Sequence, residues 1–352
     1  MPVAPAGRPR VIRPPRTLAR VARLLGVGGH VEVVEVLALF LRQDVERRCR
    51  AVAVIAISTS AILVRWSTAP SLVKALYRVC FTVALLGPFA LARHGERVRS
   101  LSYRDLLVAG LAGVALAIHF ASWFESLAWT SVAASVTLVQ AQPLFVACGA
   151  ALLLDERVTR RMGAGIAVAL GGMVVMSLGD ALTGGAVAGA RPLYGNALAI
   201  VGAIAVAAYM LVGRSLRRRI SLLPYVLVVY SACAATLLVL AVGRGAPLLG
   251  YPTREWLLFV GMAIGPGLFG HTVINWALAH VESSVVSVSL LGEPVMSTVL
   301  ALVLLSEVPT PVTIVGGAVV LGGIYVTAAD RSNHGRADPE GVPPPDTDAE
   351  EA

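Results

Sequence analysis

Apolar runs of about twenty residues alternate with short polar turns between residues 51 and 329. A helix needs about 20 apolar residues to cross the hydrocarbon core of a bilayer. The pattern therefore predicts an all-α polytopic membrane protein with about ten transmembrane helices. The predicted spans are 51–68, 72–92, 106–126, 132–154, 162–178, 194–213, 222–242, 256–278, 284–305 and 310–328.

The composition points the same way. Of the 352 residues, 57% are hydrophobic and only 14% are charged, whereas a soluble domain carries about 25% charged residues. A water-soluble globular enzyme is therefore excluded. The four cysteines, Cys49, Cys80, Cys148 and Cys233, stand far apart without a CxxC spacing. Neither a disulfide framework nor a metal site is expected.

The two ends of the chain differ from its middle. Residues 1–50 are rich in Pro and Arg, and their one apolar stretch is interrupted by Glu32 and Glu35. We predict a basic, poorly ordered arm there. An equally good interpretation is that these residues are translated from a start codon upstream of the native one. Residues 330–352 are acidic and rich in proline, a composition that predicts a disordered tail.

The positive charge follows the predicted topology. Outside the two tails, 11 cationic residues fall in loops on one predicted side and 5 on the other. Because cytoplasmic loops carry an excess of Lys and Arg, both termini are predicted to be cytoplasmic. This explains the net charge of +8 better than nucleic-acid binding does. A ratio of 28 Arg to 1 Lys is typical of a GC-rich genome and favours a bacterial plasma (inner) membrane.

An internal repeat relates the two halves of the apolar region. A shift of 151 residues aligns Leu127-Ala128 with Leu278-Ala279, Pro143 with Pro294, Glu156 with Glu307, and Gly171-Gly172 with Gly322-Gly323. We infer an ancestral duplication with repeats at 51–178 and 194–329, joined by a linker at 179–193. Because each repeat has five spans, the second is inverted relative to the first, and such a pair can expose a central site to each side in turn.

Three of the prolines within predicted spans are candidates for hinges. Pro143 and Pro294 match under the shift, and Pro266 stands between Gly265 and Gly267. Proline lacks an N–H and clashes with the carbonyl four residues back, so it bends a helix. Proline is also simply tolerated in membrane helices, but the matching pair favours hinges at Pro143, Pro266 and Pro294.

The repeated motifs resemble the ten-helix drug/metabolite transporter superfamily, specifically its tandem EamA-type members. The resemblance covers about residues 51–329 and is carried by L-L-D-E-R-V-T (153–159) and G-x-G-I-A-V-A-L-G-G (163–172), by L-L-S-E-V-P-T (304–310) and G-G-A-V-V-L-G-G (316–323), by Q-P-L-F (142–145) and E-P-V-M (293–296), and by Arg78. It implies secondary transport of small metabolites, commonly export of amino acids or toxic compounds, with no covalent cofactor.

Polar side chains within the spans are candidates for a substrate site, because exposing a charge to lipid costs about 2.5–3.5 kcal/mol even on the lenient insertion scale. Arg78 can hold a substrate carboxylate or form a structural ion pair, and Lys74 is predicted to reach the outer surface. Glu293 can carry a coupling proton, contact a cationic substrate group, or serve as a structural hydrogen-bonding residue. Gln142, which matches Glu293 under the 151-residue shift, is a further candidate. So are the helical stripe His119, Ser122, Trp123 and Ser126, the pair His271 and Asn275, and more weakly Gln140 and Tyr209.

Other features favour structural roles. Glu156 and Glu307 are placed just beyond span ends at opposite surfaces, where capping and loop contacts are expected. The small-xxx-small pairs Ala167/Gly171 and Ala318/Gly322 favour close helix packing within the monomer, with a homodimer face as the alternative.

The sequence discriminates among three classes of function. A membrane-embedded hydrolase is disfavoured because the sequence has no GxSxG, HExxH or P-loop pattern. A scaffold without transport activity is disfavoured because the tails and loops are too short for a folded domain. Within transport, Arg78 together with Glu293 favours proton-coupled export of zwitterionic amino acids. The alternatives are efflux of hydrophobic or cationic drugs and proton-coupled uptake of a sugar-like solute.

Overall fold

The computed structural model describes residues 54–153, 159–183, 190–217, 219–270 and 291–334. Within these ranges the chain forms helices and turns, with no strand. Among the described residues, six helical segments are long and apolar enough to cross a membrane, one of them the interrupted segment Val132–Leu152. This agrees with an all-α polytopic membrane protein. The predicted arm at 1–50 lies outside the described residues. The tail was predicted to begin at residue 330, but the last helix continues to His334.

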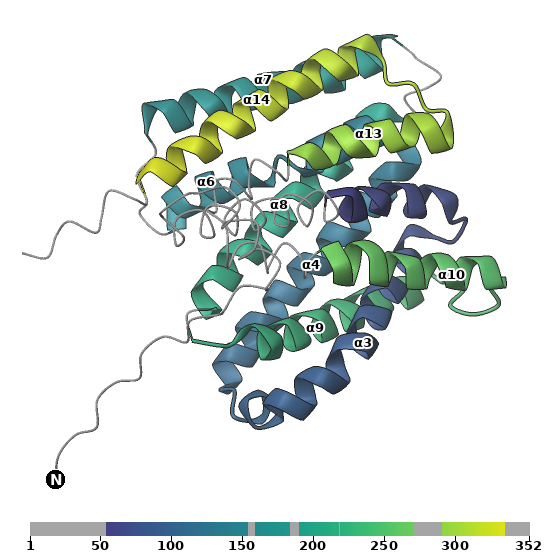
Figure 1. The fold of residues 1–352 in the computed structure, drawn as a ribbon, viewed down its shortest axis with the longest axis vertical. Coiled ribbons are helices and arrows are strands. Elements are labelled where there is room, and N and C mark those ends of the chain that lie inside the picture. The colour runs from purple at the N-terminus through teal and green to yellow at the C-terminus, as the bar shows by residue number, and fades with distance from the viewer. Residues whose placement is uncertain (1–53, 154–158, 184–189, 218, 271–290, 335–352) are drawn as a thin grey trace, which may run out of the picture. The chain divides into compact units, whose positions relative to one another are not determined.

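Figure 1 shows the described helices, each of which overlaps one of the predicted spans. Their bounds are Val54–Trp66, α3 Ser71–Arg99, α4 Tyr103–Trp129, α5 Val132–Val139, α6 Gln142–Leu153, α7 Arg160–Thr183, α8 Pro192–Leu216, α9 Leu222–Gly243, α10 Thr253–Met262, η1 Ala263–Gly270, α13 Gly292–Leu305 and α14 Pro311–His334. Their starts have ordinary causes. Ser102 and Ser131 accept hydrogen bonds from backbone N–H groups in the first turns of α4 and α5, at 3.1 Å each.

The fourth predicted span is broken in two. α5 ends at Val139, and α6 begins at Gln142 with Pro143 in its first turn. Proline is well tolerated in the first turn of a helix, where its missing N–H has no partner to lose. In the second repeat, α13 likewise begins at Gly292 and carries Pro294 in its first turn. The matched prolines therefore stand at matched helix starts.

The eighth predicted span also changes geometry. The α-helix α10 passes into the π-helix η1, which contains Pro266. A π-helix replaces the i→i+4 hydrogen-bond pattern of the α-helix by an i→i+5 pattern. Pro266 cannot take part in the α-helical pattern, because it has no N–H to donate to the carbonyl four residues back. The predicted loosening at Gly265-Pro266-Gly267 therefore takes the form of a π-helical segment.

Helices related by the repeat pack against each other. α7 packs on α14, α3 packs on α9, and the α7–α14 pair lies side by side in Figure 1. Glycines make the α7–α14 contact close: a Cβ added at Gly172 would lie 2.8 Å from the Val320 nitrogen. The predicted packing pairs were on the wrong face, because Ala167, Gly171, Ala318 and Gly322 are all exposed. The contact instead uses Gly165, Gly172, Gly316 and Gly323.

Polar contacts define two ends of the helix bundle. At one end Glu307 contacts Arg65 and Val132, and Glu255 contacts Thr68. We call this the Glu307 end. At the other end Arg219, just after α8, forms an ion pair of 3.1 Å with Asp105 at the start of α4. This is the Arg219 end.

Candidate functional site

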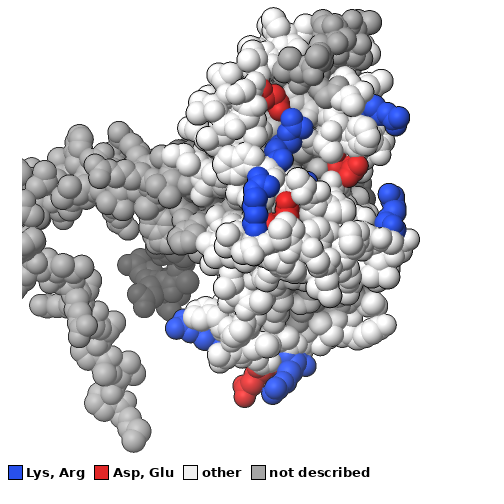
Figure 2. Space-filling model, turned by 90° about the vertical axis from the view of Figure 1, so that its right-hand side faces the viewer, with Lys and Arg blue, Asp and Glu red and all other residues white. Residues whose placement is uncertain are grey.

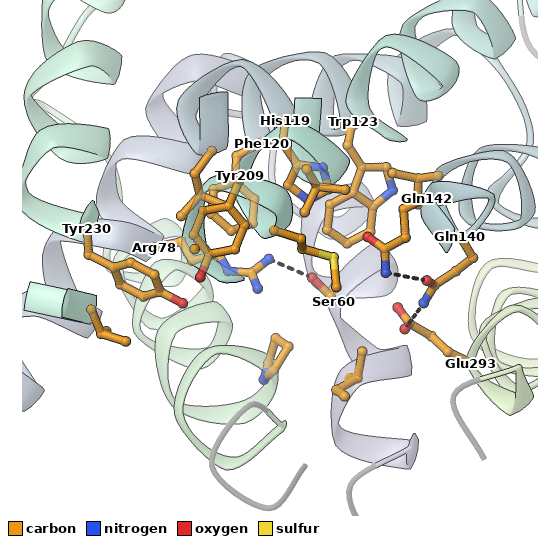
Figure 3. A pocket seen from close by; sticks show the side chains of 18 of the residues that line it. Ser60, Arg78, His119, Phe120, Trp123, Gln140, Gln142, Tyr209, Tyr230 and Glu293 are labelled. Carbon is orange, nitrogen blue, oxygen red and sulfur yellow. Dashed lines mark hydrogen bonds between the residues drawn. The ribbon is translucent and has the colours of Figure 1, made fainter. Parts of the chain in front are cut away.

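A cavity of about 410 Å³ lies among helices of both repeats. Its walls come from the first helix, α3, α4, the α5–α6 break, α8, α9, η1 and α13 (Figure 3). The described lining residues are Ile57, Ser60, Arg78, Leu116, His119, Phe120, Trp123, Val139, Gln140, Gln142, Val206, Tyr209, Met210, Gly213, Arg214, Arg217, Leu222, Tyr225, Val226, Tyr230, Pro266 and Glu293. This volume suits a small metabolite.

The cavity extends toward the Arg219 end. Arg214, Arg217 and Leu222 line it there, at the turn between α8 and α9. None of the residues that define the Glu307 end is part of the described lining. The cavity therefore lies nearer to the Arg219 end of the helix bundle than to the Glu307 end.

A buried carboxylate stands on one side of the cavity. Glu293 is only 6% exposed, and its Oε2 accepts a hydrogen bond from Nε2 of Gln140. Gln142 in turn donates from Nε2 to Oε1 of Gln140 at 3.3 Å. Figure 3 shows this chain from Gln142 through Gln140 to Glu293. A buried charge needs such partners, because removal from water without them is costly.

A buried guanidinium stands on another side. Arg78 is 4% exposed and donates from Nη1 to the Ser60 hydroxyl at 3.0 Å. Its guanidinium carbon also lies 4.6 Å from the ring centre of Phe120, within cation–π range. No ion pair joins Arg78 to Glu293, although both are described. A guanidinium has five N–H donors, so the described side-chain bond to Ser60 uses only part of its capacity.

Aromatic side chains line much of the remaining wall. His119 stacks on Trp123 with ring centres 5.8 Å apart, and its Nδ1 donates to the Gly202 carbonyl at 2.9 Å. The rings of Tyr209 and Tyr225 stack at 6.4 Å. The indole N–H of Trp123 is buried and has no hydrogen-bond partner among the residues that the structure describes. The cavity therefore combines an apolar aromatic surface with donors.

The structure brings most of the predicted site residues together. Arg78, His119, Trp123, Gln142, Glu293 and Pro266 all line the cavity, as do the weaker candidates Gln140 and Tyr209. Ser122 and Ser126 do not, because their hydroxyls bond to backbone carbonyls of α4. Pro143 and Pro294 stand beside the lining residues without lining the cavity. His271, Asn275 and Glu156 lie outside the described residues.

Sequence reasoning missed several lining residues. Tyr225 and Tyr230 were overlooked, although a tyrosine within a span has a polar tip that needs a partner. Ser60 was overlooked because a single serine in an apolar helix is common. Arg214 and Arg217 were interpreted only as topology signals, although their i, i+3 spacing places them on one helix face.

Glu307 links several elements at the opposite end. Its Oε2 forms an ion pair of 2.9 Å with Arg65, and its Oε1 accepts from the Val132 N–H at the start of α5. Arg65 also donates to the Leu127 carbonyl at 2.6 Å. Burial raises the pKa of the Glu307 carboxyl, while Arg65 and the Val132 N–H oppose that rise. The contact with the Val132 N–H caps the start of α5.

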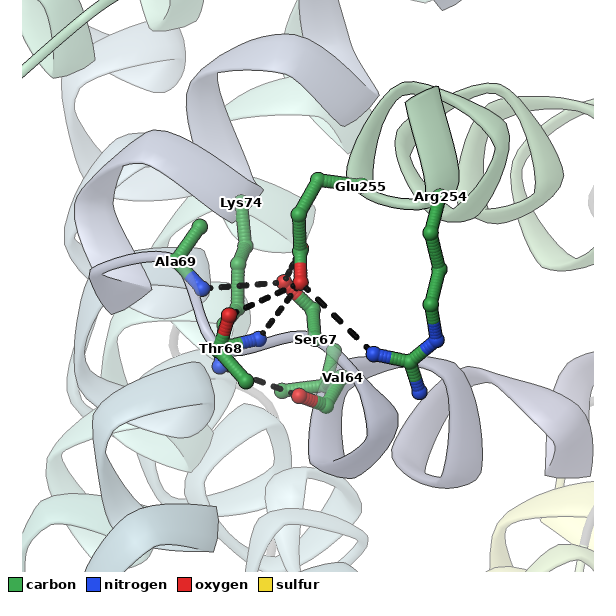
Figure 4. Close-up of polar contacts among 7 residues, drawn as sticks. All are labelled: Val64, Ser67, Thr68, Ala69, Lys74, Arg254 and Glu255. Atoms are coloured by element: carbon green, nitrogen blue, oxygen red, sulfur yellow. Dashed lines mark hydrogen bonds and ion pairs between the residues drawn. The ribbon is translucent and has the colours of Figure 1, made fainter. Parts of the chain in front are cut away.

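A second carboxylate, Glu255, is held at the same end (Figure 4). It is 1% exposed and accepts from the Ser67 hydroxyl and from the N–H and hydroxyl of Thr68, the latter two at 2.9 Å. The prediction that Lys74 reaches the surface is wrong. Lys74 is 8% exposed, and its Nζ donates to the Val64 carbonyl at 3.0 Å. The Val64 carbonyl and the nearby Glu255 carboxylate allow the Lys74 ammonium to remain buried.

One face of the molecule carries few charges. Figure 2 shows one face on which scattered Lys, Arg, Asp and Glu side chains stand among mostly uncharged residues. Large apolar side chains such as Leu111, Val239 and Val303 are more than 60% exposed. An exposed apolar surface of this kind fits contact with lipid.

Known proteins are similar in sequence to this chain. The chain matches the EamA-like transporter family over residues 50–178 and again over 193–329. An uncharacterized transporter of Archaeoglobus fulgidus is 29% identical over 67% of this chain and 82% of its own. A probable terminal-alkyne amino-acid exporter of Streptantibioticus cattleyicolor is 30% identical over 65% of this chain and 75% of its own.

Solved structures agree on the fold. One crystal structure superposes with a TM-score of 0.54 at 24% identity, covering 83% of this chain and 98% of its own. Two family matches, helices that can cross a membrane and a cavity between the two repeats lead to one conclusion. This multi-pass membrane protein belongs to the EamA-like transporter family.

Proposed function

We propose that this protein exports amino acids or closely related zwitterions from the cytoplasm in exchange for protons, by alternating access. The observation that carries the proposal is the separate placement of Arg78 and Glu293 in one cavity. A zwitterion offers a carboxylate for the guanidinium and an ammonium for the carboxylate. Because the two residues do not neutralise each other, both remain able to bind such a ligand.

The aromatic wall adds a preference for the body of the substrate. Phe120, Trp123 and Tyr209 offer flat apolar surfaces between the two charges. Such a wall favours an amino acid with an apolar or aromatic side chain over a small polar one. The name of the Streptantibioticus relative, an amino-acid exporter, supports the same substrate class.

The orientation follows from charge. Arg214, Arg217 and Arg219 cluster at the Arg219 end, where cytoplasmic loops are expected by the positive-inside rule. We place this end, together with both termini, on the cytoplasmic side of the plasma membrane. The cavity then lies on the side from which an exporter takes its substrate.

Transport by purified protein in liposomes tests the proposal. An imposed pH gradient should drive uptake of amino acids more than of sugars or cationic dyes. The amino acid methyl ester lacks the carboxylate and the N-acetyl derivative lacks the ammonium, so both should compete poorly with the parent compound. Preference for cationic dyes would favour drug efflux instead, preference for a sugar would favour uptake of a sugar-like solute, and no transport of any solute would favour a scaffold.

A further inference from the structure

The bond between Gln140 and Glu293 connects the two repeats inside the cavity. Gln140 stands in the break between α5 and α6 of the first repeat. Glu293 stands in the first turn of α13 in the second repeat. The bond therefore joins the irregular part of one repeat to the helix start of the other.

The two oxygens of Glu293 differ in their surroundings. Oε2 accepts from Gln140, whereas Oε1 accepts no hydrogen bond from a described residue. Gln140 is itself held by the amide of Gln142. The chain fixes the carboxylate in one orientation and leaves one oxygen for a ligand.

The repeat symmetry indicates when this bond can exist. Under the 151-residue shift, Gln140 matches Leu291 and Gln142 matches Glu293. When inverted repeats exchange conformations, a contact between repeats is replaced by the contact between the two residues that match its partners. The contact that matches Gln140–Glu293 is Leu291–Gln142. Leucine has no N–H or O–H in its side chain, so the matching contact contains no such hydrogen bond.

We propose that Gln140 is a positioning residue that holds Glu293 toward the ammonium group of the substrate only while the cavity faces the Arg219 end. In the opposite state Glu293 loses this donor and holds the ammonium less well. Substrate is then bound more tightly on the loading side than on the release side. The inference rests on the proposed function, because it assigns Glu293 to the ammonium of a zwitterion.

Affinity measured separately at each membrane face tests the inference. Amino acid transport is measured in right-side-out and in everted vesicles for Gln140→Leu, which places the residue found at 291 into the matching position. Loss of a hydrogen bond to a charged group should raise KM about tenfold at the Arg219 end. KM at the Glu307 end should stay within about twofold of the unaltered protein, since the bond is absent in that state.

Two further variants control the experiment. Gln142→Leu removes the outer member of the chain and keeps the Gln140–Glu293 bond, so its effect should be smaller. Gln140→Asn keeps the amide but shortens its reach, and it should reproduce the one-sided rise in KM even if Gln140→Leu fails to fold. An equal change at both faces, or none, would overturn the inference alone. An unaltered protein that transports no amino acid would overturn the proposed function and the inference with it.

Discussion

Buried carboxylates occupy two regions of this protein, and they differ in how completely they are paired. At the Glu307 end, Glu255 accepts three hydrogen bonds, and Glu307 contacts Arg65 and the start of α5. In the cavity, Glu293 accepts one hydrogen bond from a side chain. Yet the three residues are similarly buried, at 1%, 8% and 6% exposure.

The difference separates stability from function. A buried polar group whose bonds are all made stabilises one arrangement of its neighbours. A buried polar group that lacks some of its possible hydrogen bonds lowers the stability of the protein when no ligand is bound. A ligand that supplies those hydrogen bonds removes this destabilisation. The degree of pairing, rather than burial, distinguishes the structural carboxylates from the candidate binding carboxylate.

The largest effect on transport is expected when the cavity charges are removed. Glu293→Gln and Arg78→Gln should each reduce amino acid transport by about a hundredfold, equivalent to roughly 2.7 kcal/mol, because each removes one charged contact to the substrate. Melting temperatures should change little. Initial rates in proteoliposomes measure the effect, with Glu125→Gln as the control, since Glu125 bonds to Trp129 outside the cavity. Near-normal transport by both variants would contradict the cavity assignment.

A large loss of stability is expected at Glu255. Glu255→Gln removes the negative charge near the buried Lys74 ammonium, so unfolding should become easier by about 3 kcal/mol. Unfolding in detergent measures this change. Adding Lys74→Met should recover part of the loss, because no uncompensated charge then remains. A double variant that is less stable than Glu255→Gln would show that the two charges do not compensate each other.

A smaller loss of stability is expected at Glu307. Glu307→Gln keeps an acceptor near the Val132 N–H but loses the ion pair with Arg65, which is 31% exposed. The expected cost is about 1–2 kcal/mol, measured by the same unfolding experiment. Unaltered stability together with abolished transport would place Glu307 in the transport machinery instead.

The smallest effect is expected at the exposed ion pair of the Arg219 end. Arg219 is 59% exposed where it pairs with Asp105, so Arg219→Gln should change stability by at most about 0.5 kcal/mol. Transport should also stay within about twofold of the unaltered protein, as Arg219 does not line the cavity. A strong effect on either measurement would mean that exposure is a poor guide to the role of charges here.

The sequence predicted the helices well because the membrane imposes a simple rule. Each span must be apolar over a fixed length, and short turns must separate the spans. The same rule made intramembrane polar residues visible, so Arg78, His119, Gln142 and Glu293 could be selected without a structure. Their meeting in one cavity required the packing of both repeats, which the 151-residue shift only suggested.

The errors have physical causes. Lys74 was expected at the surface because a lysine near a helix end usually reaches water, but Glu255 and the Val64 carbonyl hold it inside. The packing face of α7 was misassigned because several small residues recur in that helix at similar spacing. Only the three-dimensional contact distinguishes Gly172 from Gly171.

Those two neighbouring glycines have opposite consequences for mutational tolerance. An alanine at Gly171 would meet nothing within 4 Å, whereas at Gly172 its methyl group would collide with the backbone of α14. Lipid tails are as apolar as the side chains of these helices, so the hydrophobic effect does not hold α7 and α14 together in a bilayer. Their association depends on close packing, which a methyl group at Gly172 would disrupt. Whether a small-to-larger substitution in α7 is tolerated should therefore depend on whether the position faces α14, as Gly172 does, or faces away from it, as Gly171 does, rather than on the type of residue replaced.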